Sequence, residues 1–125
     1  SGAVIAGQFD ANLTVPYRFV AVPSPGVLRG AAVNPQTGGL YLLAEFTGPL
    51  SGTPFASATR ALFAAQYGVT EPPVWAASYR ASNVDIYATG LAFRQNRLVA
   101  VGYCSSVDGS ALCPTAGVFA ISIVP

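Results

Sequence analysis

Apolar residues recur at every second position along most of this chain. Segments 4–9 and 118–123 show the pattern well, with β-branched and aromatic residues separated by small or polar ones. A period of two is typical of β-strands, whose successive side chains point to opposite faces. Gly, Pro, Asn and Asp gather between these segments, where turns need them. The pattern predicts an all-β chain with strands near 3–9, 14–22, 27–33, 40–46, 61–67, 73–79, 87–93, 98–104 and 117–124.

One segment, 55–67, also resembles a helix, because alanine is frequent between positions 58 and 66. Its second half, however, matches segments that read as strands elsewhere in the chain. We therefore predict a loop that is followed by a strand at 61–67.

The chain repeats itself. One phrase, an alternating strand that runs through a small residue, occurs at 3–13, 40–50 and 98–106, with Gly7, Ala44 and Gly102 in equivalent positions. A second motif follows each copy of the first, and it has a phenylalanine at an equivalent position each time: Phe19, Phe63 and Phe119. Repeats of this kind build equivalent structural units that stack on one another. We expect units at about 1–39, 40–97 and 98–125, the first of them abbreviated, with the three phenylalanines in the core.

The second unit resembles a known repeat. Segments 61–66, 74–79, 90–93 and 98–106, together with Asp85, are similar to the SBBP-type β-propeller repeat of bacterial surface and secreted proteins. The resemblance implies antiparallel, four-stranded blades, a secreted or cell-surface location, and a turn-stabilising role for Asp85. About two and a half units are present, which implies an incomplete propeller, whereas a propeller has four to eight blades. Completion by the rest of a longer chain, completion by further copies, and a small β-sandwich are the three alternatives.

The composition narrows the classes of partner. The chain has 125 residues, is 52% hydrophobic and only 9% charged, and carries a net charge of +1. Its six cations are all arginines spread along the sequence, so no basic stripe for nucleic acid is present. Apolar runs are too short for a membrane helix, which argues against membrane insertion. The absence of Met predicts a processed or excised piece.

Cys104 and Cys113 are the only cysteines in the sequence. Two strands joined by the eight residues between them can form a disulfide, which would stabilise the fold by about 2–3 kcal/mol. A disulfide would also indicate an oxidising compartment. The alternative is a pair of buried free thiols. A structural zinc site is not expected, because two cysteines without histidine cannot supply four ligands.

Catalytic chemistry is poorly supported by the sequence. Neither histidine nor lysine occurs, which removes the usual general bases and Schiff-base nucleophiles. Glu45 is expected to be an ordinary outward-facing strand residue. Gln8 and Tyr103 hold the equivalent positions in the other repeats, so the polarity of this position varies between repeats. The loop 105–110 offers a single carboxylate, too few for calcium. We predict no enzyme, no metal and no cofactor.

Aromatic residues are the remaining candidates for binding, because their flat faces stack on sugars and on protein partners. We select Trp75, Tyr79 and Tyr103, together with Glu45, although each aromatic also suits packing. The leading hypothesis is a non-catalytic, extracellular β-repeat module for protein interaction or self-assembly, acting through open strand edges and apolar sheet faces. Its partner would be another copy or the remainder of a larger chain. The alternatives are a lectin-like module that binds a glycan and a scaffold fragment of a larger secreted enzyme.

Overall fold

The structure is a computed structural model that describes residues 4–9, 16–34, 39–67, 73–81, 83–107, 109, 112–113 and 117–123. The fold is all-β, and all nine predicted strands are confirmed. A hairpin comprises β1 (Val4–Phe9) and β2 (Pro16–Val22). A four-stranded antiparallel sheet comprises β3 (Val27–Val33), β4 (Leu40–Pro49), β5 (Ala56–Tyr67) and β6 (Trp75–Tyr79). A three-stranded antiparallel sheet comprises β7 (Ile86–Arg94), β8 (Arg97–Cys104) and β9 (Val118–Ile123).

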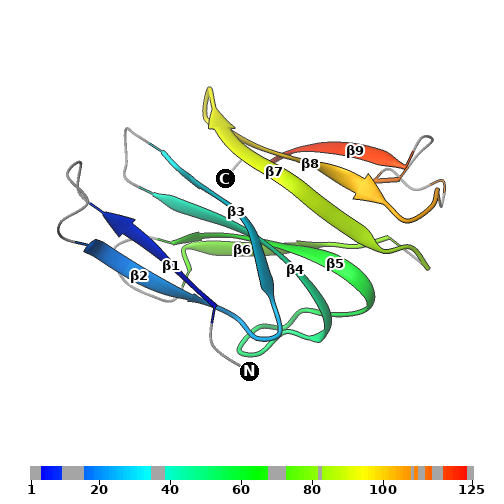
Figure 1. Ribbon diagram of the computed structural model, residues 1–125, viewed down its shortest axis with the longest axis horizontal. Coiled ribbons are helices and arrows are strands. Elements are labelled where there is room, and N and C mark those ends of the chain that lie inside the picture. Colours follow the sequence, from blue (N-terminus) through cyan, green and yellow to red (C-terminus); the bar gives the residue numbers. More distant parts are fainter. Residues whose placement is uncertain are drawn as a thin grey trace.

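The three sheets follow one another across the molecule in sequence order, with the hairpin at one side, β3–β6 in the middle and β7–β9 at the other side (Figure 1). Strands β3 and β7 approach each other closely where the two larger sheets meet. A Cβ on Gly30 would lie 2.8 Å from the Cβ of Leu91, so a larger residue there would push the sheets apart. None of the described sheets closes on itself as a barrel.

The strand register agrees with the expected correspondence of the repeated segments. Gly7 pairs with Phe19 in the hairpin, Ala44 with Phe63 in the second sheet, and Gly102 with Phe119 in the third. Strands β1, β4 and β8 are therefore equivalent, as are β2, β5 and β9.

Strands β3 and β7 extend the equivalence to a further element. Each carries a β-bulge at the same place: the extra residue is Arg29 in β3 and Thr89 in β7, directly before Gly30 and Gly90. A bulge bends its strand and interrupts the ladder, and it is a feature that related strands tend to share. Because β3 pairs with β4 and β7 pairs with β8, each larger sheet begins one strand earlier than the units predicted at 40–97 and 98–125.

The core consists of two clusters on opposite faces of β4. Leu42, Ala44 and Phe63 belong to the cluster that also contains Val22 at the end of β2. On the other face, Leu43 belongs to the cluster that lies between β3–β6 and β7–β9. Strand β4 is thus covered on both sides, which explains its nearly continuous apolar sequence. Phe63 and Phe119 are both buried, as predicted, whereas the side chain of Phe19 lies outside the described residues.

Strand β5 is longer than predicted. Residues 56–60 were expected to form a loop, but β5 starts at Ala56, which pairs with Pro49, and Ser57 pairs with Gly48. Pairing with β4 overrides the helical preference of alanine, because tertiary context usually outweighs intrinsic propensity.

The turn between β7 and β8 adopts positive φ angles without a glycine. Gln95 and Asn96 take the positive φ values instead, 51° and 61°. Two successive positive φ angles are typical of a two-residue hairpin turn whose twist matches that of the flanking strands. Asn tolerates this conformation well, and the Arg94–Arg97 pair closes the hairpin.

The predicted disulfide between Cys104 and Cys113 is present, with the two Cα atoms 6.3 Å apart. Cys104 ends β8, and both half-cystines belong to the core cluster between the two larger sheets. The bond therefore ties the loop that follows β8 to the core, and it is typical of proteins from oxidising environments.

Candidate functional site

Glu45 is the most unusual residue of the interior. It is 1% exposed, and its carboxylate lies between the two larger sheets. Oε1 accepts a hydrogen bond from Nε of Arg60 at 2.6 Å and pairs with Nε of Arg29 at 3.1 Å. Oε2 accepts a hydrogen bond from the backbone N–H of Ala88, in the neighbouring sheet, at 2.5 Å. Two guanidinium groups and one main-chain donor thus satisfy the buried charge, as a buried carboxylate requires.

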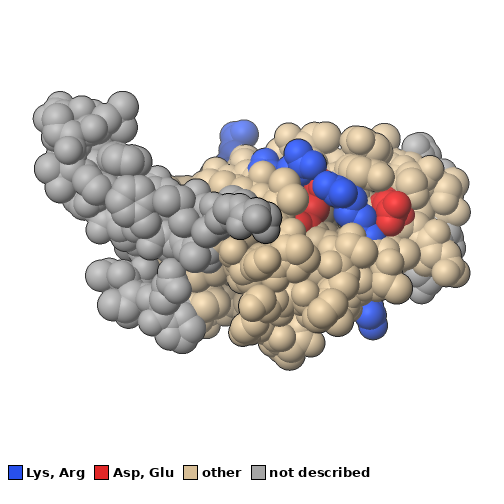
Figure 2. Space-filling view, turned by 60° about the horizontal axis from the view of Figure 1, so that its bottom comes forward, with Lys and Arg blue, Asp and Glu red and all other residues tan. Residues whose placement is uncertain are grey.

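The prediction that Glu45 faces outward was wrong. Its strand alternates, so Glu45 shares a face with Tyr41 and Leu43, and β7–β9 covers that face. The two arginines remain partly exposed, with 40% of the Arg29 side chain and 30% of the Arg60 side chain in contact with solvent. Figure 2 shows basic side chains gathered in a row at the surface, with acidic side chains beside them.

Arg60 connects the buried carboxylate to an aromatic pair at the surface. Its guanidinium carbon lies 5.1 Å from the ring centre of Tyr87, which is a favourable cation–π geometry. The Tyr87 ring stacks on Tyr103, with 4.9 Å between ring centres and an interplanar angle of 14°. Glu45 and Tyr103, both selected from sequence, are therefore linked through Arg60 and Tyr87, which were not among the selected residues.

Asp85 joins the same two sheets. Its Oδ1 accepts a hydrogen bond from the backbone N–H of Arg60 at 2.8 Å, while its own main chain exchanges hydrogen bonds with Ser105. Asp85 was predicted to stabilise a turn. Its role is structural, but the contact spans the sheet interface.

The repeat allows each larger sheet to be compared position by position. Cross-strand rows in β3–β6 contain Glu45 paired with Leu62 and Leu43 paired with Ala64. The equivalent rows in β7–β9 contain Tyr103 paired with Val118 and Val101 paired with Ala120. We call the first set, with Tyr41, the covered face, and the second set, with Tyr87 and Val99, the open face.

Equivalent residues on these two faces differ sharply in exposure. Leu43 and Leu62 are 0% exposed, whereas Val101 and Val118, which hold the same positions in the next sheet, are 40% and 66% exposed. Tyr103 is 47% exposed, whereas Glu45, which holds the equivalent position in the preceding sheet, is buried. The open face is thus an apolar sheet surface of the kind that, one repeat earlier, another sheet covers. Exposed contiguous apolar surface commonly marks an interaction site.

Trp75 and Tyr79 lie on the covered face and not on the open one. Trp75 pairs with Gln66 and Tyr79 with Leu62, and both pack half-buried against the core cluster between the sheets. Loss of water around the Tyr79 hydroxyl raises its pKa, so this group stays protonated at neutral pH. The indole Nε1 of Trp75 has no hydrogen-bond partner in the described structure. Three of the four selected residues therefore contribute to packing between sheets, and Tyr103 alone presents a large free surface.

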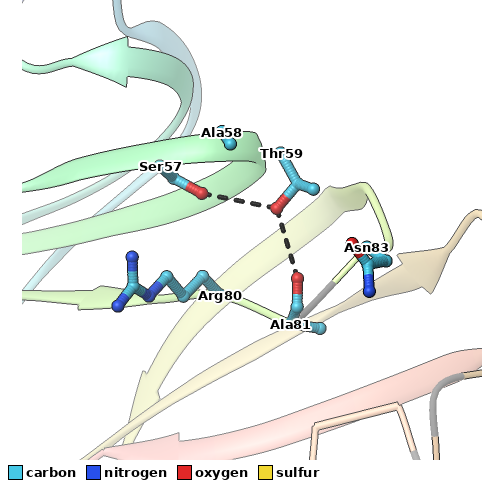
Figure 3. A pocket seen from close by; sticks show the side chains of 6 residues that line it. All are labelled: Ser57, Ala58, Thr59, Arg80, Ala81 and Asn83. Atoms are coloured by element: carbon cyan, nitrogen blue, oxygen red, sulfur yellow. Dashed lines mark hydrogen bonds between the residues drawn. The ribbon is translucent and has the colours of Figure 1, made fainter.

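A polar pocket of about 440 Å³ lies beside the start of β5. Ser57, Thr59, Arg80 and Asn83 line it together with two alanines, and the two hydroxyl groups point toward each other (Figure 3). Thr59 donates its hydroxyl proton to the carbonyl oxygen of Ala81 at 3.2 Å. Ser57 must then donate to Thr59 across 3.3 Å, which leaves the lone pairs of Ser57 free to accept.

Arg80 supplies the charge of this pocket. One of its nitrogens donates to the carbonyl oxygen of Ala56 at 3.3 Å, and within the described residues Arg80 forms no ion pair. The guanidinium retains unused donors, and the amide of Asn83 adds both a donor and an acceptor. The pocket can therefore bind a small group that carries negative charge and hydroxyls.

Several of these residues could have been found from the sequence. Strand 40–46 is apolar at odd and even positions alike, and this is the signature of a strand covered on both faces. That signature places Glu45 in the interior, where it requires cationic partners. Arg60 was missed because a loop was expected before 61–67. The turn at Asn83 was expected beside Asp85, but the pocket also needs Arg80 and the start of β5, which the sequence does not place next to that turn.

Within the described residues there is no helix that could cross a membrane. No family model, no curated protein and no solved structure matches this chain.

Proposed function

We propose that this chain is a non-catalytic β-repeat module that associates with other copies of itself by stacking sheets, in a secreted or cell-surface setting. The single observation that carries the proposal is the contrast between the covered face and the open face. Equivalent positions are buried in one sheet and exposed in the next, so the open face lacks the neighbour that its sequence suits. The resemblance to propeller repeats supports the same interpretation, with each sheet acting as one blade.

The chemistry of the interior agrees with this role. Glu45 is committed to Arg29, Arg60 and a main-chain donor, so its carboxylate is not free to act as an acid or base. Neither histidine nor lysine occurs in the sequence. The disulfide supports an extracellular location, because structural disulfides persist in oxidising compartments.

Placing a charge on the open face is expected to weaken self-association. Val118→Lys would bury an ammonium group against the apolar surface of the partner, which should raise the dissociation constant at least about tenfold. Sedimentation velocity over a series of concentrations would measure it. Val74→Lys is the matched control, because Val74 is also 66% exposed but lies outside the open face. Equal effects of the two variants, or a wild-type chain that stays monomeric, would refute the proposal.

The polar pocket favours a second candidate function, the binding of an acidic sugar. A uronic acid offers a carboxylate for Arg80 and hydroxyls for Ser57 and Asn83, and guanidinium–carboxylate pairs are strong and directional. This candidate places the glycan at the pocket and not on the aromatic residues selected from sequence.

Arg80→Gln is expected to reduce the affinity for glucuronate by about 10- to 100-fold, because a charge-assisted hydrogen bond contributes roughly 1.5–3 kcal/mol. Titration calorimetry with glucuronate and with glucose would measure the effect. Arg97→Gln is the control. Arg97 is likewise exposed, but it lies in the β7–β9 sheet, away from the pocket, and donates a hydrogen bond to Ser122 of the same sheet. Absence of saturable glucuronate binding to the wild-type chain would exclude this function.

A further inference from the structure

A second cavity adjoins the polar pocket. It has a volume of about 380 Å³ and lies beside the end of β6, and its lining residues are Ser78, Tyr79, Arg80, Leu112 and Ile121. Arg80 lines both cavities, so the two spaces meet at this side chain.

The walls of the two cavities differ in chemistry. The polar pocket offers the hydroxyl groups of Ser57 and Thr59, the amide of Asn83 and the guanidinium of Arg80. The second cavity, which we call the apolar cavity, is walled by three large and mainly apolar side chains: Tyr79, Leu112 and Ile121. An apolar ligand group gains free energy by leaving water for such a cavity, while a few polar groups fix the ligand's orientation.

The side chains of the apolar cavity are held in place by packing. Tyr79 comes from β6 and Ile121 from β9, and both contact the core cluster between the two larger sheets. Leu112 packs against the same cluster and directly precedes Cys113, which the disulfide to Cys104 anchors. The apolar cavity is therefore preformed, and a preformed site lowers the entropic cost of binding.

A uronic acid in the polar pocket would direct one of its substituents toward the apolar cavity. In the ring form of a uronic acid, the carboxylate and the anomeric substituent flank the ring oxygen, and the free hydroxyls lie on the other side of the ring. A sugar whose carboxylate pairs with Arg80 and whose hydroxyls face Ser57 and Asn83 thus carries its anomeric substituent beside Arg80. The apolar cavity begins at the same side chain.

We infer that the ligand is a glycoside of a uronic acid with an apolar substituent at its anomeric carbon, the sugar lying in the polar pocket and the substituent in the apolar cavity. This inference rests on the proposed acidic-sugar function and specifies the class of ligand. Free glucuronate fills only the polar half of the site.

Titration calorimetry with glucuronate and with phenyl β-D-glucuronide tests the class of ligand. The wild-type chain is expected to bind phenyl glucuronide at least about tenfold more tightly, because the phenyl ring leaves water for the apolar cavity. Phenyl β-D-glucoside keeps the ring but has no carboxylate, so its affinity should be about 10- to 100-fold below that of phenyl glucuronide. A glucoside that binds as tightly as the glucuronide would contradict the pairing of the carboxylate with Arg80.

Substitution at Ile121 shows where the phenyl ring lies. Ile121→Ser is expected to reduce the preference for phenyl glucuronide over glucuronate from about tenfold to within about threefold. Leu112→Ser makes the same test from a different element if Ile121→Ser does not fold, as judged by circular dichroism. Val74→Ser is the matched control and should keep the full preference, because Val74 is an exposed branched residue that is not among those lining either cavity. A preference that survives both Ile121→Ser and Leu112→Ser would place the ring elsewhere and overturn the inference.

The inference and the function on which it rests fail in different ways. Saturable binding of glucuronate with no gain from the phenyl ring would overturn the inference and leave the acidic-sugar function intact. Absence of saturable binding of both glucuronate and phenyl glucuronide would refute the acidic-sugar function itself.

Discussion

Replacing Glu45 with alanine is expected to lower the free energy of unfolding by about 2–4 kcal/mol, because the change breaks a buried ionic cluster. The variant leaves Arg29 and Arg60 without their carboxylate and leaves the N–H of Ala88 without an acceptor in the sheet interface. Both arginines reach solvent, which keeps the loss below that of a fully buried charge. Urea denaturation followed by intrinsic fluorescence would measure it.

Two variants serve as controls for Glu45→Ala. Glu45→Gln keeps an oxygen acceptor for Ala88 but removes the charge, so its loss should be about half as large. Arg97→Ala removes an exposed arginine that bonds Ser122, and its effect should stay within about 0.5 kcal/mol. If Glu45→Ala were as stable as Arg97→Ala, the ionic cluster would not hold the two sheets together.

Phe63→Ala is expected to cost about 3–5 kcal/mol, the usual range for truncating a fully buried phenylalanine. Phe63 is 1% exposed, and its ring lies 5.9 Å from that of Phe55 in a tilted arrangement. It belongs to the core cluster that also contains Val22 and Leu42, so its truncation would leave a cavity in that cluster. Thermal and chemical unfolding would both report the loss.

Phe119, which holds the position equivalent to Phe63 in the third sheet, provides a comparison for the Phe63→Ala variant. Phe119→Ala removes the equivalent ring from the third sheet, where Phe119 packs over Gly102 so tightly that an added Cβ would lie 2.8 Å from it. A loss of similar size is expected there. Phe63→Leu should cost about 1 kcal/mol, because it conserves most of the volume. A Phe63→Ala variant within 1 kcal/mol of wild type would mean that this ring does not anchor its sheet.

Much of the fold could be predicted from the sequence, because the information is local. The period of two marks most of the strands, since a half-buried sheet imposes it residue by residue, and β4, which is covered on both faces, is marked instead by a nearly continuous apolar run. The spacing of Cys104 and Cys113 makes a disulfide feasible, and the correspondence of Gly7, Ala44 and Gly102 predicts equivalent strand pairs. Each of these features depends on neighbours in the chain or on a repeated phrase.

What escaped prediction depends on contacts between sheets. Glu45 looks like a surface residue until β7–β9 is placed over it, and Arg60 is paired with it only because β5 begins at Ala56. The shared bulges at Arg29 and Thr89 arise from strand pairing and leave little trace in the alternating pattern. The open face was anticipated as unpaired edges and exposed blade surfaces, but its residues could be named only after the equivalent, covered face was known.

The concentration dependence of methyl signals in NMR spectra tests the central claim directly, because it reports burial at the open face itself. The account predicts that the methyl resonances of Val101 and Val118 shift progressively as the protein concentration rises. The methyls of Val27, Val33 and Val74, which are also exposed but lie elsewhere, should stay in place. Shifts confined to those three residues, or no shift at Val101 and Val118 at any concentration, would contradict it.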